Sequence, residues 1–230
     1  MRKRDSLFDI VAALGLFILS GVAAGSGAAL LPEGLRISVV VTLQGVLALV
    51  VVGALLAWRR QRWSDIGLSG LRLRDLARGA LAFAACLGAN VVLVYALYGA
   101  SPETVEMHSE RLGSLSRQFA ADMSLPWLVV VLGFVGVYEE VFARGFLLTR
   151  CRSLVGGTWG PVLISSLLFG LGHLYQGWIG VGQTTLIGVV LAFLTLRWGT
   201  LWPAIIAHAL LDIVSMVMMG ALGGAEAATG

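Results

Sequence analysis

Charged residues are scarce in this chain of 230 residues. Asp, Glu, Lys and Arg make up 13% of it and hydrophobic residues 58%, whereas a soluble domain carries about 25% charged residues. The composition therefore excludes a soluble enzyme and leaves no room for a nucleic-acid-binding module. The two cysteines, Cys86 and Cys151, form no C-x-x-C pair, so neither a disulfide framework nor a thiolate metal site is indicated.

Hydrophobic segments fill most of the sequence instead. Seven of them approach the ~17–25 residues that a membrane-spanning helix needs. Their bounds are 7–31, 36–58, 79–98, 125–148, 158–174, 178–197 and 202–220. A span or re-entrant segment near 100–123 would make eight, although this stretch is polar and a lid or surface helix is the alternative. Because lipid offers no partner for open backbone groups, the sequence predicts an all-α, polytopic membrane helix bundle of about seven to eight transmembrane helices.

Basic residues are unequally divided between the two ends of this predicted bundle. With seven spans, twelve of the sixteen Lys and Arg residues fall at the end that holds the N-terminus, including those of loop 59–78 and Arg150, Arg152 and Arg197. Cytoplasmic loops carry the excess of Lys and Arg. We therefore expect a multi-pass protein of the plasma membrane with its N-terminus in the cytoplasm and its C-terminus outside.

The chain is expected to form one integrated domain with two parts. Residues 1–78 would supply N-terminal transmembrane helices and a basic cytoplasmic loop. Within this loop, residues 64–78 mix apolar and basic positions, as in an amphipathic stretch at the lipid headgroups. Residues 79–222 would form the transmembrane core, which holds the polar residues described next.

Six ionisable residues stand inside the hydrophobic segments. They are Glu139, Glu140, Arg144, His173, His208 and Asp212. A charged side chain near the bilayer centre costs at least ~2.5–3.5 kcal/mol, so such residues indicate a functional site. The structural alternative is a packing network of the two glutamates with Arg144 alone, and the two histidine-bearing segments argue against it.

The spacing of the acidic residues predicts a different role for each. Glu140 precedes Arg144 by four residues, the favourable order for an ion pair on a helix. Consecutive helix residues point about 100° apart, so Glu139 faces elsewhere and is free for general acid or base chemistry. His208 and Asp212, also four residues apart, share one helix face.

His173 lies four residues after Phe169, for which we expect a packing role. Gly170 and Gly172 are small enough to let another helix approach closely. The depths of the polar residues along their segments predict a chamber in the inner half to the middle of the membrane, open to the cytoplasm. Outside this set, we expect Asn90 to bond a neighbouring helix and His108 to be solvated in a polar loop.

Three motifs in this order, on three hydrophobic segments, carry a family resemblance. They are Glu139-Glu140-x-x-x-Arg144, Phe169-x-x-x-His173 and His208-x-x-x-Asp212. Together they resemble the CPBP family of intramembrane proteases, which includes the CAAX prenyl endopeptidases, and the similarity covers roughly residues 125–215. The resemblance implies that Glu139 is the catalytic glutamate, that His173 helps it to activate water, and that His208 and the fourth residue after it stabilise the oxyanion.

One position departs from the family pattern, because the family often has Asn where this chain has Asp212. An ionised carboxylate cannot donate to an oxyanion, whereas a protonated one can. Asp212 is therefore expected either to be neutral or to orient His208. Because the H-E-x-x-H helix of zinc proteases is absent, we favour water activated without a metal; zinc held by Glu and His side chains is the alternative.

The sequence thus predicts a multi-pass endopeptidase that acts on a peptide or protein, lipidated substrates included, in or at the bilayer. Two alternatives stay open. One is a non-catalytic protein of the bacteriocin-immunity type on the same fold, and the other is a transporter that uses the same buried groups. Paired broken helices in matching halves, which favour a transporter, are lacking.

Overall fold

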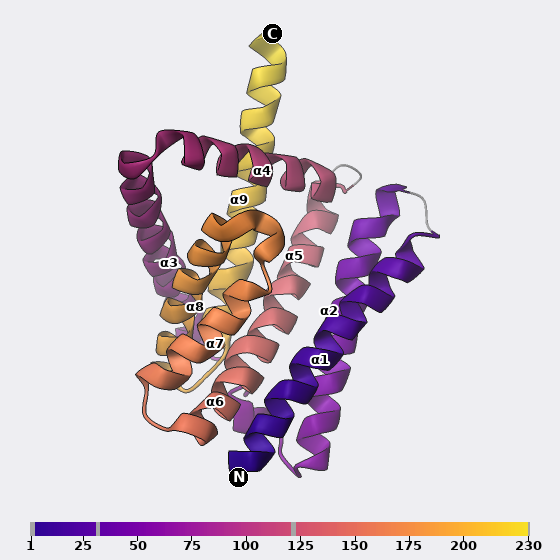
Figure 1. Ribbon diagram of the computed structural model, residues 1–230, viewed down its shortest axis with the longest axis vertical. Helices are drawn as coiled ribbons and strands as arrows, with labels where there is room; N and C mark the ends of the chain where they lie inside the picture. Colours follow the sequence, from indigo (N-terminus) through magenta and orange to yellow (C-terminus); the bar gives the residue numbers. More distant parts are fainter. Residues whose placement is uncertain (1–2, 31–32, 121–122, 230) are drawn as a thin grey trace.

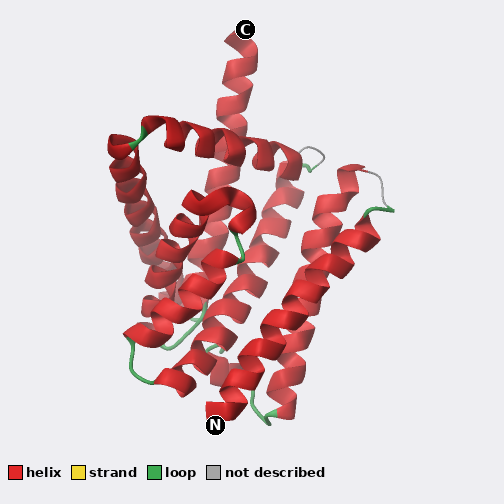
Figure 2. Cartoon of the chain, in the orientation of Figure 1, coloured by secondary structure: helices red, strands yellow, loops and turns green. Residues whose placement is uncertain are grey.

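The computed structural model describes residues 3–30, 33–120 and 123–229, and these form helices joined by short connections (Figure 2). Residues 1–2 and small parts of the predicted segments 7–31 and 100–123 lie outside these ranges. In chain order the helices are α1 (Lys3–Ala28), α2 (Glu33–Trp58), α3 (Leu73–Ala100), α4 (Pro102–Ala120), α5 (Leu125–Glu140), α6 (Leu148–Val155), α7 (Trp159–Leu171), α8 (Gly177–Trp198) and α9 (Trp202–Thr229). The π-helix η2 (Val141–Leu147) joins α5 to α6, and the 3₁₀ turns are η1 (Trp63–Ile66) and η3 (Leu174–Gln176).

The chain runs back and forth along one axis (Figure 1). Helices α1, α2 and α3 alternate in direction, α4 lies across the end of the bundle opposite the N-terminus, and α5 returns. Helices α7 and α8 form a hairpin from the N-terminal side, and α9 runs to the far end. We refer to the two ends of the bundle as the N-terminal end and the α4 end.

Six helical segments of the described chain are long and apolar enough to cross a membrane. They are Lys3–Gly27, Arg36–Trp58, Leu73–Ala100, Leu125–Val155, Leu174–Trp198 and Trp202–Met219. The predicted all-α, multi-pass membrane bundle is therefore confirmed. The fifth predicted span differs, because α7 has 13 residues, or roughly 20 Å at 1.5 Å per residue, against a hydrocarbon core of about 30 Å.

Helix α4 is a surface helix of the bundle, since it is not among the apolar segments. It docks on the hairpin through His108, whose Nε2 lies 2.6 Å from Oε1 of Gln183 in α8. Gln183 in turn donates from Nε2 to Oδ1 of Asn90 in α3 at 2.9 Å. The predicted helix–helix bond of Asn90 is confirmed, whereas the prediction of a solvated His108 is wrong because α4 folds back over the hairpin.

The largest apolar cluster closes the N-terminal end of the bundle. It joins α1, α2, η1, η2 and α9, with Val52, Leu56, Ile66, Phe146 and Leu201 at its centre. Within the predicted amphipathic stretch 64–78, Ile66 packs into this cluster, whereas Leu71 and Leu73 are exposed. The backbone N–H of Leu201 donates to the carbonyl of Gly67 at 3.0 Å, which joins this stretch to the chain just before α9.

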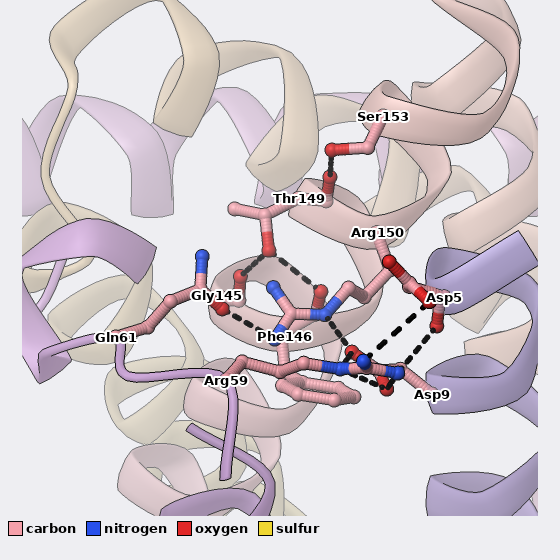
Figure 3. A network of polar contacts seen from close by, with 9 residues as sticks. All are labelled: Asp5, Asp9, Arg59, Gln61, Gly145, Phe146, Thr149, Arg150 and Ser153. Carbon is pink, nitrogen blue, oxygen red and sulfur yellow. Dashed lines mark hydrogen bonds and ion pairs between the residues drawn. The ribbon is translucent and has the colours of Figure 1, made fainter. Parts of the chain in front are cut away.

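A buried ionic network lies beside this cluster (Figure 3). The carboxylate of Asp9 in α1 accepts from Arg59 Nη2 at 2.7 Å and from Arg150 Nε at 2.9 Å. Arg150 also donates to Gln61. The hydrogen bond of Arg59 to Asp9 raises the pKa of the Arg59 guanidinium above its usual value. Asp5 lies farther from Arg59, at 3.5 Å. Arg150, predicted in a loop, is thus buried because its partner comes from α1.

Replacing Asp9 with Ala should destabilise the protein much more than replacing Asp5 with Ala. The first change leaves the Arg150 guanidinium, 1% exposed, buried without its carboxylate, which costs about 3–5 kcal/mol. Asp5 is 36% exposed, and such a surface pair contributes no more than about 1 kcal/mol. The free energy of unfolding in detergent micelles measures both changes, and equal losses would contradict this account.

Candidate active site

The two adjacent glutamates end α5, directly before the π-helix η2. Glu140 points into the protein and is 0% exposed, and its Oε1 accepts from Nη1 of Arg144 at 2.6 Å. The predicted ion pair between these residues is confirmed. Short π-helical segments occur often at functional sites, and here the segment carries the arginine of the pair.

His208 reaches the same carboxylate from α9. Its Nδ1 lies 2.7 Å from Oε1 of Glu140, and since a carboxylate accepts, Nδ1 carries the proton. The other nitrogen, Nε2, therefore faces away from Glu140. It lies 3.5 Å from Oδ2 of Asp212 and 3.7 Å from Oε2 of Glu139. Glu140, rather than Asp212, holds the Nδ1 side of the imidazole.

His173, just past the end of α7, is fixed in a similar way. Its Nδ1 donates to the backbone carbonyl of Phe169 at 3.0 Å, because a carbonyl oxygen only accepts. Its Nε2 lies 3.7 Å from Oε2 of Glu139. Both imidazole rings thus turn Nε2 toward one carboxylate oxygen.

Glu139 stands where these side chains meet. Its Oε2 is buried and has no hydrogen-bond partner in the protein, while Oε1 accepts from the Tyr138 hydroxyl at 3.4 Å. The separations of 3.7 Å exceed a direct hydrogen bond. A separation of this length leaves room for one oxygen, such as that of a water molecule, hydrogen-bonded to both the carboxylate and an imidazole.

Phe169 packs at the centre of the site. Its ring lies 4.1 Å from the guanidinium carbon of Arg144 and 4.8 Å from the ring of His173, both measured to the ring centre. The ring of His208 lies 6.0 Å away, edge to face. One aromatic side chain therefore contacts a residue from each of the three motifs.

Close approach of helices brings these elements together. A Cβ on Gly170 would collide with Thr185 Oγ1 and lie 2.9 Å from the carbonyl of Val181, so this glycine lets α7 contact α8. A Cβ on Gly136 would lie 3.1 Å from the backbone N of Ala209, where α5 meets α9. Gly172, for which the sequence predicted the same role, meets only its own helix.

A cavity of about 870 Å³ lies over the site. Glu139, His173, His208 and Asp212 line its inner part, and mostly apolar residues of α1, α2, α4, α5, η2, α7 and α9 line the rest. The lining continues toward the α4 end. Our prediction put the chamber opening on the same side as the N-terminus, and these residues do not support it. The depth of the polar residues along their segments does not predict toward which end of the bundle the chamber extends. That depends on which helices fill the space beyond the site.

Residues 121–214 match the family model for type II CAAX prenyl endopeptidase Rce1-like proteins. This segment is Rce1-like. It begins just before α5, ends within α9 and contains all three motifs, so the resemblance inferred from their residues is confirmed. No significant match was found among curated proteins or among solved structures.

Two features of the site do not follow from the motifs of the Rce1-like segment: part of the cavity wall and one contact between motifs. Helices α1 and α2 line the cavity although they precede the matched residues. The contact of Glu140 with His208 joins two motifs, and their spacing in sequence gives no sign of it. Within the described residues, no three His, Cys, Asp or Glu side chains are arranged as a group that could hold a metal ion.

Gly170→Ala should destabilise the hairpin that carries His173. The added methyl meets both a side chain and a backbone carbonyl of α8, and such overpacking costs about 1–3 kcal/mol. Gly182→Ala is the matched control on α8, because nothing lies within 4 Å of its added Cβ. Unfolding in detergent micelles measures both, and a loss of stability in the control but not in Gly170→Ala would refute the close contact.

Proposed function

We propose that this protein is an intramembrane endopeptidase that hydrolyses a peptide bond with water activated by Glu139 and His173. One observation carries the proposal: a buried carboxylate oxygen without a partner, 3.7 Å from the Nε2 atoms of both histidines. The arrangement lies in a bundle of membrane-spanning helices, and its segment matches a family of prenyl endopeptidases.

In the proposed reaction a water molecule lies between Oε2 of Glu139 and Nε2 of His173. Glu139 accepts a proton from this water as its oxygen forms a bond to the carbonyl carbon of the substrate. The C–N bond then breaks, and Glu139 returns the proton to the leaving nitrogen. His173 suits the positioning of the water, because its Nδ1 proton is held by the carbonyl of Phe169 and its Nε2 is left to accept.

His208 and Asp212 are proposed to stabilise the negative oxygen of the tetrahedral intermediate. The two glutamates beside His208 carry two negative charges, and the Arg144 guanidinium paired with Glu140 balances one of them. A second proton on Nε2 of His208 balances the other and supplies a donor. Asp212, protonated, would donate beside it. Donors aimed at a developing oxyanion in a site that excludes bulk water are commonly worth several kcal/mol.

The apolar walls of the cavity favour an apolar peptide or protein segment as substrate, including one that carries a lipid. We further propose that the protein lies in the plasma membrane with its N-terminus in the cytoplasm, from the excess of basic residues at the N-terminal end. No residue in the proposed reaction needs a metal ion.

Glu139→Gln should abolish cleavage of an apolar fluorogenic peptide by purified protein in liposomes, because an amide cannot accept the proton from water. Circular dichroism and thermal unfolding should match those of the wild type. Glu103→Gln, at an exposed carboxylate in the first turn of α4, is the control and should retain full turnover. Full turnover by Glu139→Gln would rule out this mechanism.

Cleavage by the wild type should be unaffected by prior dialysis against EDTA or by 1,10-phenanthroline. If activity were lost on chelation and restored by Zn²⁺, the proposed metal-free activation of water would be wrong. The rates before and after metal addition, on one protein preparation, decide between these outcomes.

A further inference from the structure

The side from which a substrate reaches the chamber can be inferred from three features of the bundle. The first is the apolar cluster at the N-terminal end. Phe146 and Leu201 are 0% exposed, and Leu56 packs with them between the site and that end. The ionic network of Asp9 and Arg150 joins helices α1 and α6 beside this cluster. Together they close the chamber on the N-terminal side.

The second feature is the course of the cavity beyond the catalytic residues. Leu112, Leu115 and Phe119 of α4 line it, as do Tyr175 and Gln176 of η3. These residues come from the α4 end of the bundle, where α4 lies across the hairpin (Figure 1). The chamber therefore extends from the site into the half of the bundle that is farther from the N-terminus.

The cavity also reaches the outer surface of the bundle sideways. Ile18 of α1 and Leu171 of α7 both line it, and their residues are 64% and 44% exposed. A membrane bundle presents such apolar surface to lipid. The chamber wall between α1 and α7 is thus the place where an apolar segment can pass from the bilayer into the site.

The third feature is charge. Exposed arginines gather at the N-terminal end, and they include Arg60, Arg62, Arg72, Arg74, Arg152 and Arg197. On α4, by contrast, Arg111 and Arg117 share the helix with three glutamates. Since Lys and Arg are enriched in cytoplasmic loops, the closed end faces the cytoplasm and the α4 end faces the opposite side.

From these features we infer that the chamber takes its substrate from the non-cytoplasmic half of the bilayer, through the opening between α1 and α7. The inference rests on the proposed hydrolysis and adds the substrate class. That class is an apolar, membrane-embedded peptide segment whose scissile bond lies in that half. A peptide presented from the cytoplasm would meet the apolar cluster at the N-terminal end instead of Glu139.

Labelling of single cysteines tests the orientation without any need for activity. Gln118→Cys places a thiol on the exposed, chamber-lining face of α4, and Arg152→Cys places one on exposed α6; the native Cys86 and Cys151 are buried. A membrane-impermeant maleimide added to intact cells should label Gln118→Cys and leave Arg152→Cys unlabelled. Inverted vesicles should give the reverse. Labelling of Gln118→Cys only in inverted vesicles would overturn the inference.

Cleavage of two membrane-anchored reporters tests the route. Their scissile sequences are identical and lie in opposite halves of the bilayer. The wild type should cut the reporter with its site in the non-cytoplasmic half. Ile18→Trp should lower kcat/KM for it by on the order of tenfold, because the indole narrows the opening and misplaces the substrate. Leu19→Trp is the matched control, since Leu19 is equally exposed at 63% but does not line the cavity, and it should leave cleavage unchanged.

The outcomes separate this inference from the proposed function. If the wild type cut the reporter in the cytoplasmic half and Glu139→Gln abolished that cleavage, the hydrolase would stand and the inferred side would be wrong. If Glu139→Gln still cut either reporter, the proposed mechanism would fail whatever the labelling showed. Equal effects of Ile18→Trp and Leu19→Trp would exclude the opening between α1 and α7 as the route.

Discussion

The carboxylate of Glu140 is the interaction on which the site depends. Taking a carboxylate out of water costs several kcal/mol, and here two charge-assisted hydrogen bonds offset that cost: one from Arg144 at 2.6 Å and one from His208 at 2.7 Å. Because Arg144 also stacks on Phe169, the single carboxylate links α5, η2, α7 and α9. It also decides which nitrogen of His208 faces the chamber.

Glu139 and Glu140 have different roles because consecutive residues of a helix point in different directions. Glu140 turns to the protein interior, where its Oε1 accepts from both Arg144 and His208 and its Oε2 is buried without a partner. The side chain of Glu139 is 16% exposed and keeps one oxygen without a partner. A carboxylate held by two charge-assisted hydrogen bonds is a poor base, and those two bonds at Glu140 come from Arg144 and His208. The buried pair at Glu140 therefore leaves Glu139 as the carboxylate that can exchange a proton.

The sequence predicted contacts between residues close together in the chain, and the order of the three motifs predicted the family resemblance. The Glu140–Arg144 pair followed from a spacing of four residues, and the apolar lengths gave a membrane helix bundle. The bond between Glu140 and His208 joins residues 68 apart, and no periodicity reports it. Arg150 follows the apolar segment 125–148, which predicts a loop; its partner Asp9 lies 141 residues away, so the sequence gives no sign of their contact. The shortness of α7 and the course of the chamber depend on neighbouring helices, so segment length alone could not give them.

The two ionic clusters explain why the bundle is closed at one end and hollow toward the other. Lipid is as apolar as the side chains it surrounds, so close packing and interhelical polar contacts help to decide which membrane helices adjoin. Asp9, Arg59 and Arg150 draw α1, the end of α2 and α6 together at the N-terminal end. Glu140, Arg144 and His208 do the same for α5 and α9 deeper in the bundle. Beyond that level α1 and α2 contribute apolar residues to a cavity wall instead of a packed core. The position of the paired charges along α5, η2 and α6 thus sets where the packed core ends and the chamber begins.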